Sequence, residues 1–462
     1  MTKKKATINR RDFLKASAAV AAFTILPSRV FGVDGKPSAN EKLNVAGIGV
    51  GGMGGSNLAS CENENIVALC DVDAGGYAAK TIAKYPKAKV YKDFRVMLDE
   101  QKDIDAVIVA TPDHSHAVIG LSVIQRGKHV FIQKPLAHSV YEARVLTEAA
   151  RKHKVMTQMG NQGHSGDSTR LICEWIWSGV IGDVREVHAW TNRPVWPQGV
   201  EVDRPSETPA VPSTLDWDLW IGPAAMRPYH PTYHPGTWRA WCDFGTGSLG
   251  DLGCHVMDCA FWALKLKYPV SVEGNISTYW KGLWQRTDPK NEQFPRSTIV
   301  RYKFPARENM PEVKMTWWDG GMLPPRPEVL EKGRRMGDDE GGVLFMGDKG
   351  VLMCGCYGRS PRLIPELRMK DFKQPDRTLE RIPGGEGGHV KDWVRSCKDG
   401  KPASSNFNYS GPFAETVVMG NLAVRYPNRE LLWDGENMKV TNDADADSYV
   451  RRQYRDGWKL NV

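Results

Sequence analysis

Asp251 and His255 are the residues whose types and spacing most directly suggest acid–base chemistry in this chain. They stand four positions apart, so on a helix their side chains share one face. A neutral histidine there can take the proton of an alcohol while hydride leaves the alcohol carbon. Lys134 can add a fixed positive charge that stabilises the developing alkoxide. These three residues are the predicted catalytic group, although a single histidine on a helix is more often an ordinary polar residue.

A glycine-rich turn is the second feature that can do chemistry. Gly49, Gly51 and Gly54 match the pattern G-x-G-x-x-G directly after an apolar run and at the expected start of a helix. Such glycines let the backbone approach a pyrophosphate. Asp71 follows the next apolar run, where its carboxylate can accept hydrogen bonds from both ribose hydroxyls. No arginine adjoins Asp71, and a 2′-phosphate would meet like charge, so the pattern favours NAD over NADP.

The elements that must position these residues alternate along the first third of the chain. Short apolar runs between helical patterns predict a doubly wound parallel sheet, a Rossmann domain over residues 41–160. Its expected strands are 43–48, 66–70, 106–110, 129–132 and 155–159. Expected helices run from the glycine turn to about 61, over 116–126, and from a capping box at Ser139 and Glu142 to about 153.

The remainder, residues 161–462, predicts a second α/β domain with an open, mostly antiparallel sheet. A helix is expected from about 169 to Gly179, and strands over 184–190, 271–279, 298–304, 313–318 and 350–353. Residues 192–240 are rich in Pro, Trp, Tyr and His without a lasting period, which indicates a long ordered loop region. Residues 449–458 have a charged, helical pattern that predicts a helix packed on the body or on a neighbour.

Composition excludes several classes of protein. The 462 residues are 41% hydrophobic and 25% charged, which indicates a globular protein without an integral membrane domain. Most of the net charge of +8 lies in residues 1–32, so the body has no basic stripe for a nucleic acid. Nine scattered cysteines predict buried thiols and no metal site. The sequence also allows a disulfide between Cys354 and Cys356.

The first 40 residues have the layout of an export signal and a linker. A basic stretch with consecutive Arg10 and Arg11 precedes the apolar residues 16–26 and then Pro27. Residues 9–15 resemble the twin-arginine motif, whose transport route carries folded proteins. The alternative is a buried amphipathic helix. The signal implies a periplasmic or otherwise exported protein.

Taken together, four motifs make the chain from residue 41 onward resemble the glucose-fructose oxidoreductase, inositol dehydrogenase and MocA family. These are the glycine turn, Thr111-Pro112 with His116, Gln133-Lys134-Pro135, and Asp251-x-x-x-His255. The resemblance implies an NAD(P)-dependent oxidoreductase acting on CH–OH groups, and a homodimer or homotetramer. It implies cofactor contacts from Gly49, Gly51, Gly54, Asp71, Thr111, Pro112, His116, Gln133 and Lys134. Gln133 stands where this family usually has glutamate. The change removes a negative charge next to Lys134 and leaves the pKa and the exact role of Lys134 open.

Substrate contacts are expected from the segment after the last Rossmann strand and from the aromatic-rich region. Asn161 and His164 follow that strand and are placed to face a substrate. Trp190, Trp196 and Arg239 are candidates to contact a carbohydrate, since aromatic faces suit sugar C–H surfaces. Buried loop packing explains most of the tryptophans equally well.

Three functions fit these features. The first is transfer of hydride between a secondary hydroxyl of a sugar, glycoside or cyclitol and a tightly held NAD. An exported enzyme meets no nicotinamide pool, so its cofactor must be loaded before export and recycled in place. The second is a redox-neutral NAD-dependent glycosidase, which oxidises, eliminates, hydrates and reduces. The third is a sugar-binding protein without catalysis.

Overall fold

The structure is a computed structural model that describes residues 41–200, 203–287 and 292–462. The predicted signal and linker, residues 1–40, therefore lie outside the described residues. Residues Leu43–Val462 form one compact unit, which contains every element of the fold discussed below.

A six-stranded parallel sheet occupies the N-terminal part of this unit, in the order β3-β2-β1-β4-β5-β6. Its strands are β1 (Asn44–Ile48), β2 (Asn65–Cys70), β3 (Lys89–Tyr91), β4 (Ala106–Val109), β5 (His129–Ile132) and β6 (Thr157–Met159). The central strands are apolar on both faces because helices cover both. The doubly wound sheet is confirmed. The short edge strand β3 was not predicted, since Lys89 and Val90 are exposed and carry no apolar period.

The helices between these strands are α2 (Met53–Ala59), α3 (Ala79–Ile82), α4 (Phe94–Glu100), α5 (His116–Gln125) and α6 (Val140–His153). Of these, α2, α5 and α6 begin where the sequence signals place them, whereas α3 and α4 were not predicted. The predicted capping box of α6 is confirmed, because the Ser139 side chain accepts the Glu142 N–H and the Glu142 carboxylate accepts the Ser139 N–H. This reciprocal cap fixes the point where the chain turns from β5 into α6.

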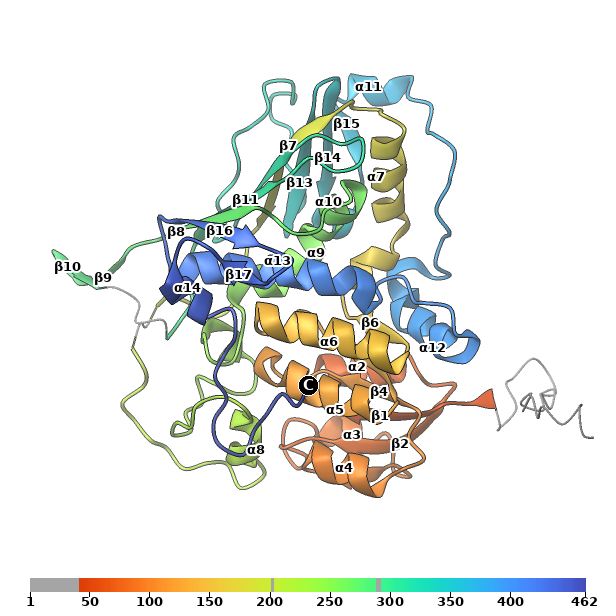
Figure 1. Cartoon of the computed structure of the whole chain (residues 1–462), viewed down its shortest axis with the longest axis vertical. Coiled ribbons are helices and arrows are strands. Elements are labelled where there is room, and N and C mark those ends of the chain that lie inside the picture. The colour runs from red at the N-terminus through yellow and green to blue at the C-terminus, as the bar shows by residue number, and fades with distance from the viewer. Residues whose placement is uncertain (1–40, 201–202, 288–291) are drawn as a thin grey trace, which may run out of the picture. The chain divides into compact units, whose positions relative to one another are not determined.

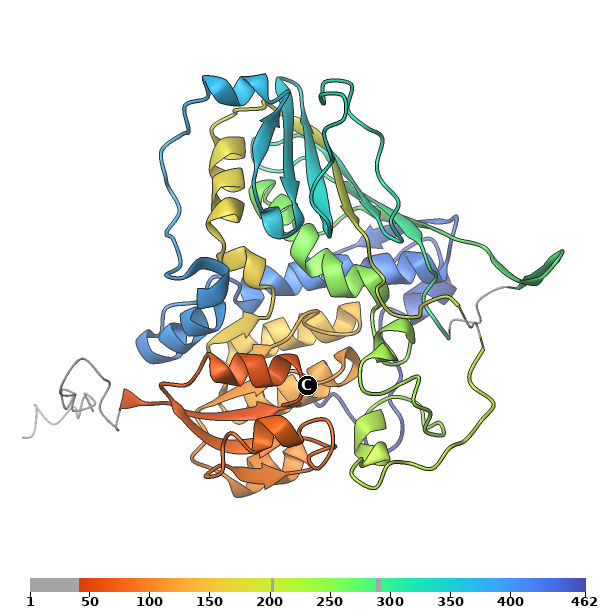
Figure 2. The ribbon, with the colours of Figure 1, turned by 180° about the vertical axis from the view of Figure 1, so that it is seen from behind.

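A helix from far along the chain completes one face of the parallel sheet. In α12 (His389–Asp399), Val390 and Trp393 pack in one cluster with Val45, Leu69 and Phe131 of the strands. Figure 2 shows this helix beside the N-terminal sheet, although residues 160–388 separate it from the last strand of that sheet. The C-terminal region therefore supplies part of the core of the first domain.

The second sheet has nine strands in the order β15-β14-β13-β7-β12-β11-β8-β16-β17. Every neighbouring pair is antiparallel except β7 with β12, so the predicted mostly antiparallel sheet is confirmed. Its strands are β7 (Val184–Thr191), β8 (Ser271–Ile276), β11 (Thr298–Phe304), β12 (Val313–Trp318), β13 (Gly341–Gly347), β14 (Gly350–Gly355), β15 (Arg362–Ile364), β16 (Glu430–Asp434) and β17 (Lys439–Val440).

Helices join the two sheets. The long α13 (Phe407–Arg425) packs on α6 on one side and on β8 on the other, as Figure 1 shows. Arg144 of α6 and Glu415 of α13 form a buried ion pair with two hydrogen bonds of 2.8 Å. The remaining helices of this part are α7 (Asp167–Trp177), α8 (Trp217–Ile221), α9 (Cys254–Val256), α10 (Asp258–Ala263), α11 (Leu367–Lys370) and α14 (Ala444–Ser448).

The aromatic-rich region is ordered, as predicted, and has its own core. The rings of Trp217 and Trp220 stack with centroids 4.7 Å apart, and Tyr233, Trp241 and Phe244 pack around them. In contrast, Trp280, Leu283 and Trp284 are exposed on a hairpin formed by β9 (Tyr279–Gly282) and β10 (Gln285–Thr287), which extends away from the sheet (Figures 1 and 2). The predicted strand over 271–279 is thus interrupted after Ile276.

The prediction of a helix over residues 449–458 is wrong, because α14 ends at Ser448 and an irregular segment follows. This segment packs on the body through individual side chains. Tyr454 donates to the Glu142 carboxylate at 2.5 Å, and Arg455 donates to the Gly222 carbonyl at 2.6 Å. Bonds to backbone carbonyls and a buried carboxylate on separate elements stabilise the extended path better than a solvated helix would.

All nine cysteines lie among the described residues and none is paired, including Cys354 and Cys356. The described part of the chain gathers no three His, Cys, Asp or Glu side chains as a metal ion would need. Within the same residues, no helix is both long enough and apolar enough to cross a membrane.

Removing one partner of the Arg144–Glu415 pair tests how the two sheets are held together. We expect Glu415→Leu to lower the free energy of unfolding by about 3–5 kcal/mol, because it leaves a buried guanidinium without its carboxylate. The double variant Arg144→Met/Glu415→Leu should recover most of this loss. Urea unfolding provides the measurement.

The exposed pair of Lys89 and Glu100 provides the control, since Glu100→Ala should cost less than about 1 kcal/mol. A cost as small as this for Glu415→Leu would mean that the buried pair does not stabilise the junction.

Candidate active site

One cavity of about 370 Å³ lies at the carboxyl ends of the parallel strands. It opens where the strand order reverses between β1 and β4, the usual ligand site of an open α/β sheet. Residues that follow β1, β2, β4 and β5 line one end, and residues of the second domain line the other. The cavity thus joins the predicted cofactor residues to the predicted catalytic residues.

The glycine turn between β1 and α2 fits only glycine at its key positions. Gly49 has φ +74°, and a Cβ atom there would lie 2.8 Å from the backbone of Ala110. A Cβ at Gly54 would lie 2.0 Å from the Gly49 carbonyl oxygen, and one at Gly51 would lie 2.4 Å from the Tyr77 ring. The turn therefore forms a cradle for a ligand that approaches the bare backbone.

Asp71 orders this cradle. Its carboxylate accepts hydrogen bonds from the Val50 N–H at 2.8 Å, the Gly51 N–H at 3.4 Å and the Asp73 N–H at 2.9 Å. Burial raises the pKa of Asp71 although these three donors oppose the rise. The sequence predicted ribose hydroxyls as the partners of Asp71. In the structure the carboxylate lines the cavity and also holds the glycine turn in shape.

The turn after β4 contributes Thr111, Pro112 and Asp113 to the cavity wall. The Thr111 hydroxyl is buried and has no hydrogen-bond partner within the described residues. Burial raises the pKa of Asp113 to about 7, although the Thr246 hydroxyl donates to its carboxylate at 2.5 Å. A carboxyl that titrates near neutral pH therefore lies at the cavity.

His116, a predicted cofactor residue, does not line the cavity. It begins α5 and is fully buried, with its ring nitrogens 2.8 Å from the Pro135 carbonyl and 2.9 Å from the Thr111 carbonyl. Burial lowers the pKa of His116 to about 4, so the neutral ring donates to only one of them. Its place between the two carbonyls holds the turns after β4 and β5 together.

Lys134 and Asp251 meet across the cavity. The Lys134 ammonium donates to Asp251 Oδ1 at 2.6 Å and to the Asp251 carbonyl at 2.8 Å. Burial acts to raise the pKa of Asp251, but the charges of Lys134 and Arg239 together hold it below its usual value. Gln133 donates to Asn57 at 2.9 Å and accepts the Lys134 N–H at 3.3 Å. The neutral amide thus anchors the turn that carries Lys134.

His255 lines the same end of the cavity and is 4% exposed. Leu249–Gly253 is a π-helical turn that leads into α9, so the four-residue spacing predicted for an α-helix spans a wider turn here. The Nδ1 atom of His255 is buried without a partner in the described part of the chain. Burial, and then the charge of Lys134, lower the pKa of His255 well below its usual value, so the ring is neutral.

Two further side chains of the site were not predicted from the sequence. The Tyr357 ring packs against His255 with centroids 4.6 Å apart, and Tyr357 itself has φ +60°, a strained conformation for a side chain of this size. Arg193 lies with Nε 3.7 Å from Asp251 Oδ2 and donates to Glu340 at 2.9 Å. Neither residue belongs to a local motif, and only the folding of the second sheet brings them to the cavity.

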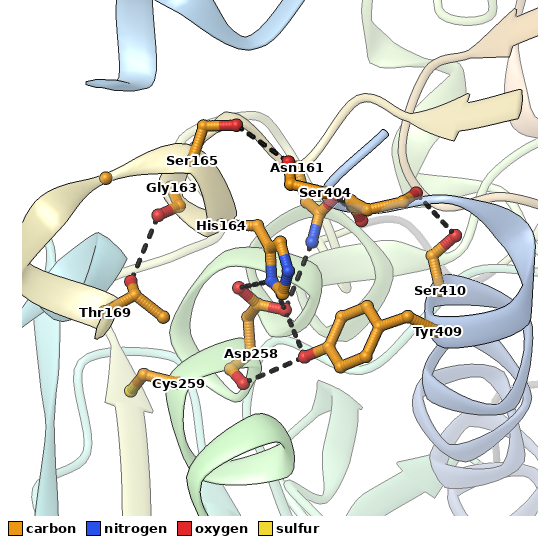
Figure 3. Close-up of polar contacts among 12 residues, drawn as sticks. Asn161, Gly163, His164, Ser165, Thr169, Asp258, Cys259, Ser404, Tyr409 and Ser410 are labelled. Carbon is orange, nitrogen blue, oxygen red and sulfur yellow. Dashed lines mark hydrogen bonds and ion pairs between the residues drawn. The ribbon is translucent and has the colours of Figure 1, made fainter. Parts of the chain in front are cut away.

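Asn161 and His164, predicted to face a substrate, lie in a buried polar network instead (Figure 3). His164 Nδ1 lies 3.0 Å from an Asp258 carboxylate oxygen, and the Asn161 amide donates to Asp258 at 3.2 Å. The Tyr409 hydroxyl donates to the same carboxylate at 2.7 Å. The network ties the loop after β6 to α10 and α13, next to the segment that carries His255.

The predicted aromatic contacts divide in a similar way. Trp190 is 2% exposed and packs with Met336, Leu344 and Met353 on the second sheet, away from the cavity. Trp196 is partly buried and donates to Gln198 at 3.0 Å, and it does not line the cavity. Arg239 does line it, with Nε 3.5 Å from Asp251.

Comparisons with known protein families match three regions of the chain. Residues 43–161 match the model of an oxidoreductase family with an NAD-binding Rossmann fold. Residues 186–286 match the C-terminal alpha/beta domain of the same oxidoreductase family. Residues 7–27 match the signal sequence of the twin-arginine translocation pathway, so the predicted export signal is confirmed.

Individual proteins resemble the chain more distantly. A glycosyl hydrolase family 109 protein of Shewanella sp. (strain ANA-3) is 29% identical over 306 residues, which cover 60% of this chain and 64% of that protein. The inositol 2-dehydrogenase of Salmonella paratyphi B is 31% identical over 147 residues, 30% of this chain and 43% of that one. Thus less than two thirds of the length of these relatives is matched.

A solved structure of levoglucosan dehydrogenase in complex with NADH superimposes with a TM-score of 0.56. The two are 18% identical, and the match covers 84% of this chain and 98% of that one. At this identity the likeness concerns the fold alone.

The glycine cradle can be tested with single methyl groups. We expect Gly54→Ala to weaken NAD binding at least about tenfold, equivalent to about 1.4 kcal/mol, because its Cβ would lie 2.0 Å from the Gly49 carbonyl. Calorimetric titration of the nucleotide-free protein measures the change. Gly387→Ala is the matched control, because its Cβ would meet no atom within 4 Å. Equal affinity in both variants would contradict the cradle.

Proposed function

We propose that this chain is a member of the Gfo/Idh/MocA oxidoreductase family, and that it is an exported NAD-dependent enzyme acting on a secondary hydroxyl of a sugar, glycoside or cyclitol. The observation that carries the proposal is the Lys134–Asp251 ion pair of 2.6 Å beside a neutral His255, in the same cavity as the glycine cradle. These groups suit removal of a proton and a hydride from one CH–OH group.

When bound, the nicotinamide cofactor supplies the acceptor for hydride. The chain's own residues orient the substrate hydroxyl and remove its proton. Lys134 orients the substrate oxygen and stabilises the negative charge that develops on it, while Asp251 holds the ammonium in place. His255 accepts the hydroxyl proton, for which its neutral form is required. Tyr357 packs on the His255 ring and fixes its plane.

We propose the cofactor contacts from Gly49, Gly51, Gly54, Asp71, Thr111, Pro112, Gln133 and Lys134, all of which except Gly54 line the cavity. The negative Asp71 at the cradle favours NAD over NADP. His116 acts on the cofactor only through the turns it holds. Because the signal directs export, we propose that NAD is retained on the protein and recycled there.

The chain is proposed to work as three parts: signal and linker over 1–40, cofactor binding over 41–160, and substrate binding and assembly over 161–462. A homodimer or homotetramer in the periplasm is part of this proposal. Contact between copies would bury exposed apolar side chains such as Leu283 and Trp284, which are 84% and 85% exposed.

A redox-neutral glycosidase is the second candidate, favoured by the glycosyl hydrolase family 109 name of a relative that aligns over 306 residues. Product analysis separates the two functions. Release of the aglycone from an aryl glycoside without net NADH would establish the glycosidase. Oxidation of a free sugar with stoichiometric NADH would establish the dehydrogenase. A non-catalytic sugar-binding protein would do neither.

Replacing Lys134 tests the proposed catalysis. We expect Lys134→Met to lower kcat at least about 100-fold, because the developing alkoxide loses its charged partner. Bound nucleotide per chain is measured on the same preparations and kcat is expressed per bound nucleotide, so that loss of the cofactor contact from Lys134 is separated from loss of chemistry. Turnover is measured with the substrate found by product analysis. Unchanged kcat in Lys134→Met would contradict the assignment.

The pH dependence of kcat distinguishes His255 from Asp113, two of the titratable groups at the cavity. His255 has a pKa well below 6.5, so its ionisation should leave no acid limb near that pH. Asp113 has a pKa raised to about 7, so it is neutral below and gains a negative charge above this pH. Asp113→Asn should remove any change of kcat near pH 7. A limb near 6.5 that survives in Asp113→Asn would contradict this assignment of the pH dependence.

A further inference from the structure

Three cationic side chains converge on one carboxylate at the catalytic end of the cavity. Lys134 Nζ lies 2.6 Å from Asp251 Oδ1, Arg239 Nε lies 3.5 Å from the same oxygen, and Arg193 Nε lies 3.7 Å from Oδ2. Each cation lines the cavity. One carboxylate cannot balance three cations, so the remaining partners of each decide the charge that a ligand meets.

Two of these cations have a carboxylate partner at hydrogen-bond distance. Lys134 donates to Asp251, and Arg193 donates to Glu340 at 2.9 Å. Arg239 shares the Asp251 oxygen that Lys134 already holds, at a longer distance. Among the described residues its one further hydrogen bond is from Nη1 to the Gly236 carbonyl at 3.1 Å. Arg239 is therefore the cation without a carboxylate of its own.

Arg239 is also the most open of the three. Its side chain is 35% exposed, against 15% for Lys134 and 16% for Arg193. The guanidinium carbon lies 4.3 Å from the Trp238 ring centroid, so the planar group is held against an aromatic face. A stacked guanidinium keeps an edge free for bidentate contact with a planar carboxylate.

Of the other carboxylates of the cavity, Asp113 offsets part of this charge when it ionises, and the two at the cradle end are held by other groups. Asp71 and Asp93 lie after β2 and before α4, at the cradle end, where Asp71 holds the glycine turn and Asp93 pairs with Arg95. Asp113 is buried, and the Thr246 hydroxyl donates to it. Oxidised nicotinamide would add a further positive charge to the region. A neutral sugar would leave the excess uncompensated, whereas a negative substrate would balance it.

We propose that the substrate is an acidic sugar, whose carboxylate binds Arg239 while a ring hydroxyl is oxidised at Lys134 and His255. This inference rests on the proposed function and names its substrate class. The reaction takes two electrons and one proton equivalent as hydride from the carbinol carbon to the cofactor, and one proton from the hydroxyl to His255. The carboxylate takes no part in the redox step and serves only for binding and orientation.

Matched pairs of sugars test the proposal on the holoprotein. The pairs are glucuronate with glucose, galacturonate with galactose, and mannuronate with mannose, and glucose 6-phosphate tests phosphate as the anion. Calorimetric Kd and reduction of the bound cofactor are both measured. In the pair that reacts, we expect the acid to bind at least about tenfold more tightly than the neutral sugar. Added NaCl should reduce this preference, because part of it is Coulombic.

Variants assign the preference to one side chain. Arg239→Met should remove it, Arg239→Lys should keep part of it, and both should retain the thermal unfolding midpoint of the wild type. Arg185→Met is the control, because that side chain is 61% exposed and pairs with Asp183 on the surface. It should leave the preference unchanged.

Three outcomes overturn the inference. The first is that the neutral member of the reacting pair binds as tightly as the acid. The second is that the preference for the acid survives in Arg239→Met. The third is that glucose 6-phosphate binds more tightly than glucuronate. The last outcome would assign the site to phosphate. If neither acids nor neutral sugars, cyclitols and glycosides reduce the bound cofactor, the proposed function fails as well, and the two failures are thereby distinguished.

Discussion

The ion pair between Lys134 and Asp251 is the contact on which the rest of the site depends. Lys134 follows the strand β5 of the parallel sheet, and Asp251 lies in the π-helical turn of the second domain. A 2.6 Å bond across this junction places the glycine cradle and His255 in one cavity. A largely buried pair of this kind is stable only if both elements that carry it are rigidly held.

The helices between the two sheets meet that requirement. The helix α13 packs on both α6 and β8, and the Arg144–Glu415 pair fixes its contact with α6. The network of Asp258, His164 and Tyr409 ties α10 to the loop after β6 and to α13 (Figure 3). His255 is three residues before Asp258, so this buried network also supports the segment that carries His255.

Local patterns predicted the cofactor half of the molecule well. The glycine turn, the capping box of α6 and the apolar strands each depend on residues close together in sequence, and the structure confirms all three. The substrate half was harder, because its wall is made by residues that the second sheet brings together from positions 193 to 357. Tyr357 and Arg193 carry no signal that distinguishes them from other surface residues. Conversely, Asn161 and Trp190 were predicted to contact a substrate, but contacts with distant elements bury them.

We propose that this protein both carries an export signal and retains its nicotinamide cofactor. The most direct measurement is the amount of NAD and NADH released on denaturing the exported protein, purified without added nucleotide. We expect close to one nucleotide per chain, because the glycine cradle is complete and no external pool of nucleotide would refill it. Protein that leaves the cell empty and binds added NAD only weakly would contradict it.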